Sequence, residues 1–414
     1  MSKISKNIVI VSALYPPEPV VSAQISADLA NSLESQGHKV TVLCPFPTRP
    51  AGFKFESIFY NRSIDIKVNN NITVVRLPSY VSPESRMFSR LRESFSFGKH
   101  SSNYIKKNIL QTDIVYANTW PLLGQNILAR SLKKYQIPLV LHIQDIYPES
   151  LLEKLPKWIK KIIQVPLIYL DKQSVNLASV IIVVSKNMFH FYKENRGIAE
   201  KKILLISNWQ DESFFVNKKQ QNKFIDKSVF TFMYLGNIGP VAGVELLIRS
   251  FMKTNSANAQ LIIAGSGSHK EGCQKIASKG KNIYFIDIPT GLSAVADMQS
   301  KADILLLPVK KNAAMSSVPS KLIAYLFSAK PIIATVDKES DTAKTLIEAK
   351  CGWVGEPENE DWLTQQMNNV MHENRILLAK MGESGFNYGI KNFSKREGCK
   401  KLSNIILSNL YEYK

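Results

Sequence analysis

The 414-residue sequence is poor in the features that mark secreted, membrane-spanning and metal-binding proteins. Its four cysteines lie far apart, with neither CxxC spacing nor a neighbouring histidine cluster: Cys44, Cys273, Cys351 and Cys399. This pattern indicates neither a disulfide framework nor a zinc site, so we expect a reducing, cytosolic compartment. No apolar run approaches the roughly 20 residues of a membrane-spanning helix. The short run after Lys6 leads into "YPPEP" without a cleavage site, and we interpret it as a buried strand.

Acidic side chains are also scarce relative to basic ones. Fifty-three lysines and arginines stand against 34 aspartates and glutamates, which gives a net charge of +19, and residues 1–209 carry +13 of it. Such a charge attracts nucleic acid, anionic lipid or a phosphorylated substrate, or it is simply a solvated basic surface. The sequence contains no recognition-helix, RRM or KH pattern, so we expect no nucleic-acid partner.

Short β-branched runs alternate with helical patterns along the chain. A first series of expected strands comprises residues 7–13, 39–45, 113–118, 139–145 and 180–185, and a second comprises 230–237, 260–265, 282–287, 303–308 and 331–336. Alternation of this kind predicts right-handed βαβ units around parallel sheets. Because 414 residues exceed what one core usually serves, the sequence predicts an α/β fold with two Rossmann-like, doubly wound domains.

A polar, lysine-rich segment at 208–228 reads as the linker between the two domains. We therefore expect an N-terminal domain at 1–207 and a C-terminal domain at 208–392. The tail, about 393–414, has a helical pattern that places four apolar residues on one face: Leu402, Ile405, Ile406 and Leu410.

Ligands of doubly wound domains bind at the carboxyl ends of the strands, where the second domain has two glycine turns. "YLGNIGPVAGVELL" and "IIAGSGSHKEG" each place glycines between a strand and a helix. Such glycines let backbone N–H groups approach a phosphate, or they simply close a tight turn. No acidic residue follows at the spacing that ribose recognition needs, which disfavours a dehydrogenase. The residues we assign to phosphate binding are Gly236, Asn237, Gly239 and Gly265.

The segment "SSVPSKLIAYL" begins an apolar helix after the strand at 303–308. The free N–H groups and the positive dipole end of that helix favour an anion, and a serine and a lysine there make a diphosphate site. The alternative is an ordinary helix cap with the lysine in solvent. The sequence has no convincing Asp-x-Asp motif that could coordinate a divalent cation, so we expect no metal. The residues assigned here are Ser317, Pro319, Ser320 and Lys321.

Two basic amphipathic stretches, residues 85–107 and 156–172, are typical of helices that lie on an anionic membrane surface. Both mix lysine and arginine with aromatic and aliphatic side chains at helical spacing. Packing of their apolar faces inside the domain is the alternative. The residues we assign to membrane contact are Arg86, Arg90, Arg92, Lys157, Trp158, Lys160 and Lys161.

Six motifs follow one another along the chain: "YPPEP…GHKVTVL", "LHIQDIYPES", "ISNWQDESFF", "YLGNIG", "PSKLIAYL" and "NFSKREG". Together they resemble glycosyltransferase family 4, the retaining GT-B enzymes, and within it the bacterial polysaccharide enzymes of the colanic-acid and fucosamine-transferase type. The resemblance implies two Rossmann-like domains facing across a cleft, with the C-terminal helix returning to the first. It also implies sugar transfer from a UDP- or GDP-sugar to an undecaprenyl-diphosphate-linked glycan of a capsule, O-antigen or exopolysaccharide. The protein would work at the inner face of the cytoplasmic membrane.

The resemblance further assigns roles in the first domain. Asp145, in "QDIYPE", matches an acidic position common in the family and would orient the acceptor or donor sugar as the catalytic residue, while a turn aspartate is the alternative. No cofactor is implied beyond the nucleotide-diphosphate sugar itself, because the leaving phosphate would take the acceptor proton. The residues that would contact the acceptor are Tyr15, Glu18, Gln24, Asn118, Trp120 and His142, although His142 is also typical of a packed strand histidine.

The sequence departs from the family pattern in three places: Val20 and Val21 replace a glycine pair, Pro240 and Ala242 replace basic residues, and Ser316 and Ala324 replace two glutamates. These changes remove the ribose carboxylate and leave Lys321 more phosphate charge to neutralise. Two alternatives to the transferase therefore stay open: a GT-B nucleotide-sugar epimerase, and a catalytically weakened relative that acts as a binding protein.

Overall fold

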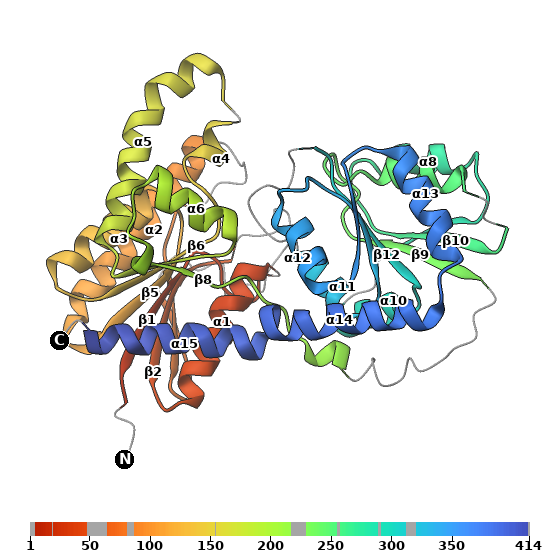
Figure 1. Ribbon diagram of the computed structural model, residues 1–414. Helices are drawn as coiled ribbons and strands as arrows, with labels where there is room; N and C mark the ends of the chain where they lie inside the picture. Colours follow the sequence, from red (N-terminus) through yellow and green to blue (C-terminus); the bar gives the residue numbers. More distant parts are fainter. Residues whose placement is uncertain are drawn as a thin grey trace. The chain divides into compact units, whose positions relative to one another are not determined.

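The computed structural model describes residues 5–18, 20–47, 64–80, 87–153, 155–216, 229–254, 257–288, 291–311 and 320–412 (Figure 1). The chain divides into two compact units, each with its own sheet. Unit 1 comprises Met1–Asn208 and Gly398–Lys414, and unit 2 comprises Trp209–Glu397. The prediction of two doubly wound α/β units is confirmed.

Unit 1 contains an eight-stranded sheet in the order β3-β4-β2-β1-β5-β6-β7-β8, parallel except for the antiparallel β3–β4 pair. Its strands are β1 (Asn7–Ser12), β2 (Lys39–Pro45), β3 (Asp65–Asn69), β4 (Ile72–Leu77), β5 (Ile114–Asn118), β6 (Leu139–Ile143), β7 (Val180–Val183) and β8 (Ile203–Leu205). Its helices are α1 (Val21–Ser35), α2 (Met87–Lys107), α3 (Leu123–Lys134), α4 (Glu149–Leu152), α5 (Lys157–Leu177), α6 (Lys186–Asn195) and most of α15 (Lys395–Glu412). The strand order reverses between β1 and β5, where sheets of this kind form a ligand-binding crevice.

Unit 2 contains a six-stranded parallel sheet in the order β11-β10-β9-β12-β13-β14. Its strands are β9 (Phe230–Leu235), β10 (Ala259–Ala264), β11 (Ile283–Ile286), β12 (Ile304–Pro308), β13 (Ile332–Thr335) and β14 (Gly352–Gly355). Its helices are α8 (Val244–Met252), α9 (Lys270–Ala277), α10 (Leu292–Ser300), α11 (Ser320–Phe327), α12 (Asp341–Ala349), α13 (Glu360–Met371) and α14 (Arg375–Phe393). Here the strand order reverses between β9 and β12.

Successive residues of the central strands of unit 2 feed two separate cores. Met233 and Leu235 of β9 pack in the cluster with α11, α12 and α14, whereas Phe232 and Tyr234 pack in the cluster with α8, α9 and α13. Figure 1 shows α11 and α12 on one face of this sheet and α8 and α13 on the other. Because helices cover both faces, the central strands β9, β12 and β13 are continuous apolar runs, and the sequence predicted them.

The C-terminal helix returns to unit 1, as predicted. Leu402 and Ile406 of α15 are fully buried, and Leu410 is nearly so. The hydroxyl of Ser403 lies 3.2 Å from that of Ser32 in α1. The apolar face predicted from the sequence is therefore the face that packs on unit 1.

Candidate functional site

Two glycine turns meet at the carboxyl ends of β9 and β10. Gly236 has a φ of +148°, and a Cβ built on it would lie 2.1 Å from Cε of Lys321. A Cβ on Gly265 would lie 2.2 Å from the carbonyl oxygen of Gly236. The amide of Ile238 donates to the carbonyl of Ser266 at 2.8 Å and so joins the two turns. Glycine is required here because backbone and the lysine stem occupy the space of a side chain.

The ammonium group of Lys321 lies over the first turn. Its Nζ donates to the Tyr234 hydroxyl at 2.5 Å and stands 4.4 Å from the centre of the Tyr234 ring. The Tyr234 hydroxyl donates in turn to the main-chain oxygen of Asn237 at 2.6 Å. Burial lowers the pKa of Lys321 to about 8, and no carboxylate among the described residues offsets that effect. A partly buried cation without a counter-ion is suited to bind an anion.

The other predicted phosphate-binding residues lie on the two glycine turns and at the start of α11, as far as the structure describes them. The side chain of Asn237 is exposed and folds over the turn toward Gly239. Ser320 is the exposed first residue of α11, and its carbonyl accepts a hydrogen bond from Gln210 Nε2 at 2.9 Å. The structure thus brings together Gly236, Asn237, Gly239, Gly265, Ser320 and Lys321. Ser316, Ser317 and Pro319 lie outside the described residues.

Three positions at which the sequence departs from the family pattern lie within the described residues of unit 2. Ala324 is only 7% exposed and packs in the core formed with α11, so a glutamate there would need space that the core now fills. Pro240 is exposed and Ala242 is 7% exposed. The turn after β9 therefore contributes main-chain groups and an asparagine, but no charged side chain.

Unit 1 has a pocket of about 190 Å³ at the carboxyl ends of β1, β5 and β6. This position is the crevice where the strand order of the sheet reverses. Asp145 lines the pocket together with three of the predicted acceptor residues, Asn118, Trp120 and His142. The amide of Ile146 donates to one carboxylate oxygen of Asp145 at 2.8 Å, which is the contact of a turn aspartate. A role of Asp145 toward a bound sugar stays a prediction.

His142 belongs to a chain of polar side chains beside this pocket, of which Tyr116 and His142 are buried and Gln144 and Asn208 are half-buried. Its Nδ1 lies 2.6 Å from the Tyr116 hydroxyl, and its Nε2 lies 3.2 Å from the side-chain nitrogen of Gln144. The oxygen of Gln144 accepts a hydrogen bond from Asn208 at 2.9 Å. His142 is 1% exposed, and burial lowers its pKa to about 3, so the imidazole is neutral near pH 7. These contacts favour the interpretation of His142 as a packed histidine that orients Gln144. They do not favour a role of His142 in proton transfer.

The three other predicted acceptor residues do not line the pocket. The amide of Tyr15 donates to a carboxylate oxygen of Glu18 at 3.3 Å, and Glu18 is 4% exposed. Burial raises the pKa of Tyr15 to about 12. Gln24 donates to Asp28 at 2.8 Å within α1. The polar groups of this segment are thus engaged in contacts within unit 1.

Arg196 joins three helices around the same pocket. Its guanidinium is 2% exposed and donates through Nε to Asp171 at 2.6 Å. One of its terminal nitrogens donates to both oxygens of Glu149, at 2.8 and 2.7 Å, and to the carbonyl of Tyr147 at 3.1 Å. Asp171 and Tyr147 both line the pocket. The ion cluster therefore holds α4, α5 and the end of α6 in place around the pocket.

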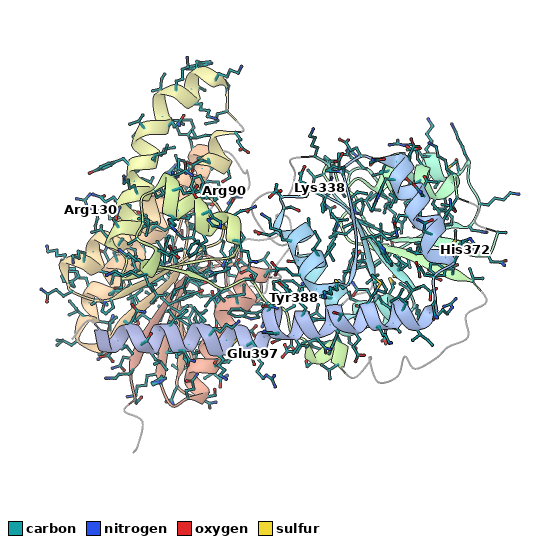
Figure 2. All side chains as sticks on the ribbon, viewed as in Figure 1. Arg90, Arg130, Lys338, His372, Tyr388 and Glu397 are labelled. Atoms are coloured by element: carbon teal, nitrogen blue, oxygen red, sulfur yellow. The ribbon has the colours of Figure 1, made fainter. Side chains whose placement is uncertain are left out.

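Of the two basic helices, α2 is engaged within unit 1. Arg90, labelled in Figure 2, pairs with Glu93 at 2.5 Å, and the guanidinium of Arg92 lies 4.2 Å from the centre of the Tyr80 ring. Phe97 is completely buried, and a Cβ built on Gly98 would lie 2.6 Å from Cα of Gly124 in α3. Arg86 lies outside the described residues. The side of α2 that carries Phe97 therefore packs on its own unit, whereas Phe88 and Phe95 of the same helix remain 77% and 48% exposed.

Helix α5 instead exposes a row of apolar side chains. Its inward face packs through Leu167, while Lys157 and Lys161 are exposed and Lys160 is half-buried. Four large apolar residues point outward with exposed fractions of 67%, 69%, 73% and 64%: Trp158, Ile162, Val165 and Tyr169. Figure 1 shows the N-terminal half of α5 projecting beyond the rest of unit 1. No helix in the described part of the chain is long and apolar enough to cross a membrane.

Sequence reasoning missed several residues that build these sites. Tyr234 carried one signal, since a tyrosine two residues before Gly236 can reach the end of the strand where a ligand would bind. Gln144 carried no signal beyond its place beside Asp145 in the motif "QDIYPE". Arg196 and Asp171 carried no local signal, because they lie 25 residues apart and meet only through tertiary packing. In the described ranges no three His, Cys, Asp or Glu side chains gather as a metal site.

Comparison with known proteins matches the whole architecture. The family model described as "Glycosyltransferase Family 4" matches residues 23–214, and "Glycosyl transferases group 1" matches residues 215–388. The probable glycosyltransferase WbjE of Pseudomonas aeruginosa is 22% identical over 358 residues, which cover 80% of this chain and 82% of WbjE. The putative colanic acid biosynthesis glycosyl transferase WcaI of Escherichia coli K12 is 23% identical over 339 residues, which cover 77% and 81%.

Solved structures share the fold at low sequence identity. Sucrose-phosphate synthase from Thermosynechococcus elongatus superposes with a TM-score of 0.70 and 14% identity over 99% of this chain and 100% of that one. A glycosyltransferase from Rickettsia africae superposes with a TM-score of 0.67 and 15% identity, over 98% of this chain and 99% of that one. Anabaena HepE in complex with UDP superposes with a TM-score of 0.65 and 13% identity, over 97% of this chain and 100% of that one. With two family models that together extend from residue 23 to residue 388 and a fold shared over nearly the full length, the chain belongs to glycosyltransferase family 4 and has the GT-B fold.

Proposed function

We propose that this glycosyltransferase moves a sugar, with retention, from a nucleotide-diphosphate donor to a lipid-linked glycan of a surface polysaccharide. The name of WcaI, which refers to colanic acid biosynthesis, and the UDP in the HepE structure support these substrate classes. The observation that carries the proposal is the Lys321 ammonium, which Tyr234 holds over Gly236 and which has no acidic partner in the described parts of the chain.

In the proposed reaction the acceptor hydroxyl attacks the anomeric carbon from the side that the diphosphate leaves. The bond between that carbon and the phosphate oxygen breaks as the new glycosidic bond forms, and the leaving oxygen takes the hydroxyl proton. Negative charge builds up on the diphosphate, where Lys321 and the main-chain N–H groups of the glycine turn stabilise it. Asp145 would accept a hydrogen bond from a sugar hydroxyl. No metal or other cofactor takes part in this scheme.

Titration of the purified protein with UDP, GDP and a panel of their sugars tests the donor class directly. The nucleotide sugar that binds is then incubated with the protein and a membrane lipid extract. NMR determines the anomeric configuration of the product. Micromolar binding of one nucleotide series and a product with the donor's configuration are the expected results. Binding of no nucleoside diphosphate would sink the proposal, and conversion of a nucleotide sugar without transfer would favour an epimerase.

Donor binding should depend on pH through the Lys321 ammonium. With a pKa of about 8 the group is half deprotonated at pH 8, and a bound diphosphate favours its charged form. The phosphate itself has a pKa of about 6 and does not titrate in this range. We therefore expect affinity for UDP to fall by up to about tenfold per unit above pH 8, with uptake of a proton on binding. Calorimetry at pH 8.5 in buffers of different ionisation enthalpy measures that proton, and a heat independent of the buffer would contradict this picture.

We place membrane contact on α5. Its exposed apolar residues are spaced four, three and four positions apart, which puts them on one face of the helix. Exposed Lys157 and Lys161 stand among them, and a helix with such a composition lies in the lipid interface. Each lysine near an anionic surface contributes about 1 kcal/mol, which salt screens over about 8 Å. This location would bring the enzyme to an undecaprenyl-diphosphate-linked acceptor at the inner face of the cytoplasmic membrane.

Replacing both Ile162 and Tyr169 with serine should abolish sedimentation with vesicles that contain phosphatidylglycerol, and so should Lys157→Glu with Lys160→Glu and Lys161→Glu. Nucleotide affinity should stay unchanged, because it is assigned to unit 2. Leu110→Ser is the matched control, since Leu110 is 98% exposed in unit 1 but stands away from α5 in the sequence. A wild-type protein that stays in the supernatant, or a control variant that loses binding equally, would refute the assignment to α5.

A further inference from the structure

The glycine turn between β9 and α8 supplies no cation to the phosphate group it is proposed to bind. Its residues, 236–243, read Gly-Asn-Ile-Gly-Pro-Val-Ala-Gly. A nucleoside diphosphate carries at least two negative charges near pH 7, and Lys321 offers only one positive charge. Burying an anion beside a single ammonium leaves charge uncompensated, which is costly in a site of low dielectric. A second cation close to this turn would complete the site.

The neighbouring strand end brings such a cation to the turn. Strand β12 lies next to β9 in the sheet, and both end at the reversal of strand order (Figure 1). The amide of Lys310, two residues after β12, donates to the carbonyl of Val241 at 3.1 Å. A Cβ built on Gly243 would lie 3.3 Å from Cβ of Pro308. The segment that carries Lys310 is therefore fixed against the end of the turn, and Lys321 lies over its beginning.

Among the described residues Lys310 makes no direct ion pair, and its charge acts on this region through space. Glu245, in the first turn of α8, is partly buried, which raises its pKa, but hydrogen bonds from its own amide and from His269 and the charge of Lys310 bring the pKa below its usual value. Lys310 contributes through space only, since His269 makes the side-chain hydrogen bond to Glu245. Lys270, the next candidate cation, already pairs with Asp287 at 3.0 Å.

We propose that Lys310 is a second donor-binding residue, which neutralises the diphosphate together with Lys321 in place of a basic side chain in the turn. This inference rests on the proposed function, because it assigns a further contact to the same donor site. Lys321 donates a hydrogen bond to Tyr234, whereas the main chain of Lys310 is held by Val241 and its ammonium makes no ion pair within the described residues. A diphosphate then lies between two cations that come from different elements of unit 2.

Replacing Lys310 with methionine removes the charge and keeps most of the side-chain volume. We expect the affinity for UDP, or for GDP if that is the series the wild type binds, to fall about tenfold, as for loss of one charged hydrogen bond. Affinity for the corresponding nucleoside should stay within a factor of two. Lys311→Met is the matched control, since Lys311 is the next residue and is exposed. It should bind the nucleotide within a factor of two of the wild type.

Calorimetry and a thermal unfolding scan of each variant separate the outcomes. If Lys310→Met binds the nucleotide as the wild type does while Lys321→Met does not, the role of Lys310 is refuted and the proposed donor site stands. If Lys310→Met and Lys311→Met weaken binding equally, a general charge effect replaces the specific contact and the inference is wrong. If the wild type binds neither UDP nor GDP, the proposed function itself fails and the inference fails with it.

Discussion

Lys321→Met should lower the affinity for a nucleoside diphosphate by about 10- to 150-fold at pH 7, which corresponds to about 1.5 to 3 kcal/mol for a charged hydrogen bond in a desolvated site. Methionine keeps an unbranched side chain over Gly236, so the turn should retain its shape. The ring and hydroxyl of Tyr234 remain, and only the ammonium is lost. Isothermal titration with UDP and GDP measures the change.

Lys338→Met is the control for this experiment, because Lys338 is an exposed lysine of unit 2 (labelled in Figure 2) that pairs with Glu356 at 3.1 Å. Its affinity should match that of the wild type. The Tyr234→Phe variant keeps the ring under the ammonium and removes the hydroxyl. Its affinity for the nucleoside diphosphate should therefore fall less than that of Lys321→Met. Equal affinity of wild type and Lys321→Met would remove the phosphate role of this lysine.

Arg196→Met should lower the free energy of unfolding by about 3 to 5 kcal/mol at pH 7.5, because it leaves a buried carboxylate without its partner. Asp171 is 2% exposed, and burial raises its pKa to about 6 even though Arg196 donates a hydrogen bond to it. Without that hydrogen bond the pKa rises further. Urea denaturation followed by circular dichroism measures the difference from the wild type.

The sign of the pH dependence gives this prediction a second test. A carboxyl whose pKa is higher in the folded than in the unfolded state binds more protons when folded, so its burial becomes less costly as the pH falls below that pKa. The destabilisation by Arg196→Met should therefore be smaller at pH 5 than at pH 7.5. Arg249→Met, which breaks an exposed pair with Glu360, should cost at most about 1 kcal/mol at either pH. A loss for Arg196→Met as small as that of the control would contradict the role of the cluster.

Much of the fold could be predicted from the sequence because its strands are buried on both faces. Continuous runs such as residues 230–237 and 303–308 have no other stable place than the middle of a parallel sheet. The β3–β4 pair was missed because β3 lies at the sheet edge and is largely exposed, and its alternation of Ile66 and Val68 with polar residues extends over only five positions. Strand β14, four residues long and only partly buried, was missed for the same reason.

The candidate sites were predictable where function needs a local backbone feature. Glycines at the ends of β9 and β10 are visible in the sequence, because a positive φ and close backbone contact allow no other residue. Whether the apolar faces of the two basic helices are buried or exposed could not be predicted from the sequence. Periodicity marks an apolar stripe, but only the packing of Phe97 against the unit and the exposure of Ile162 show which stripe is buried.

The sequence by itself determined the strands, the glycine turns and the apolar face of the C-terminal helix, since each depends on residues close together in the chain. Tertiary structure alone decided that Lys321 meets Tyr234, 87 residues away, that Arg196 meets Asp171 and Glu149, and that Lys310 lies beside Val241. The physical reason is strand order: in a doubly wound sheet the neighbours in space are not the neighbours in sequence, and a side chain finds its partner only once the sheet has placed the strand ends together.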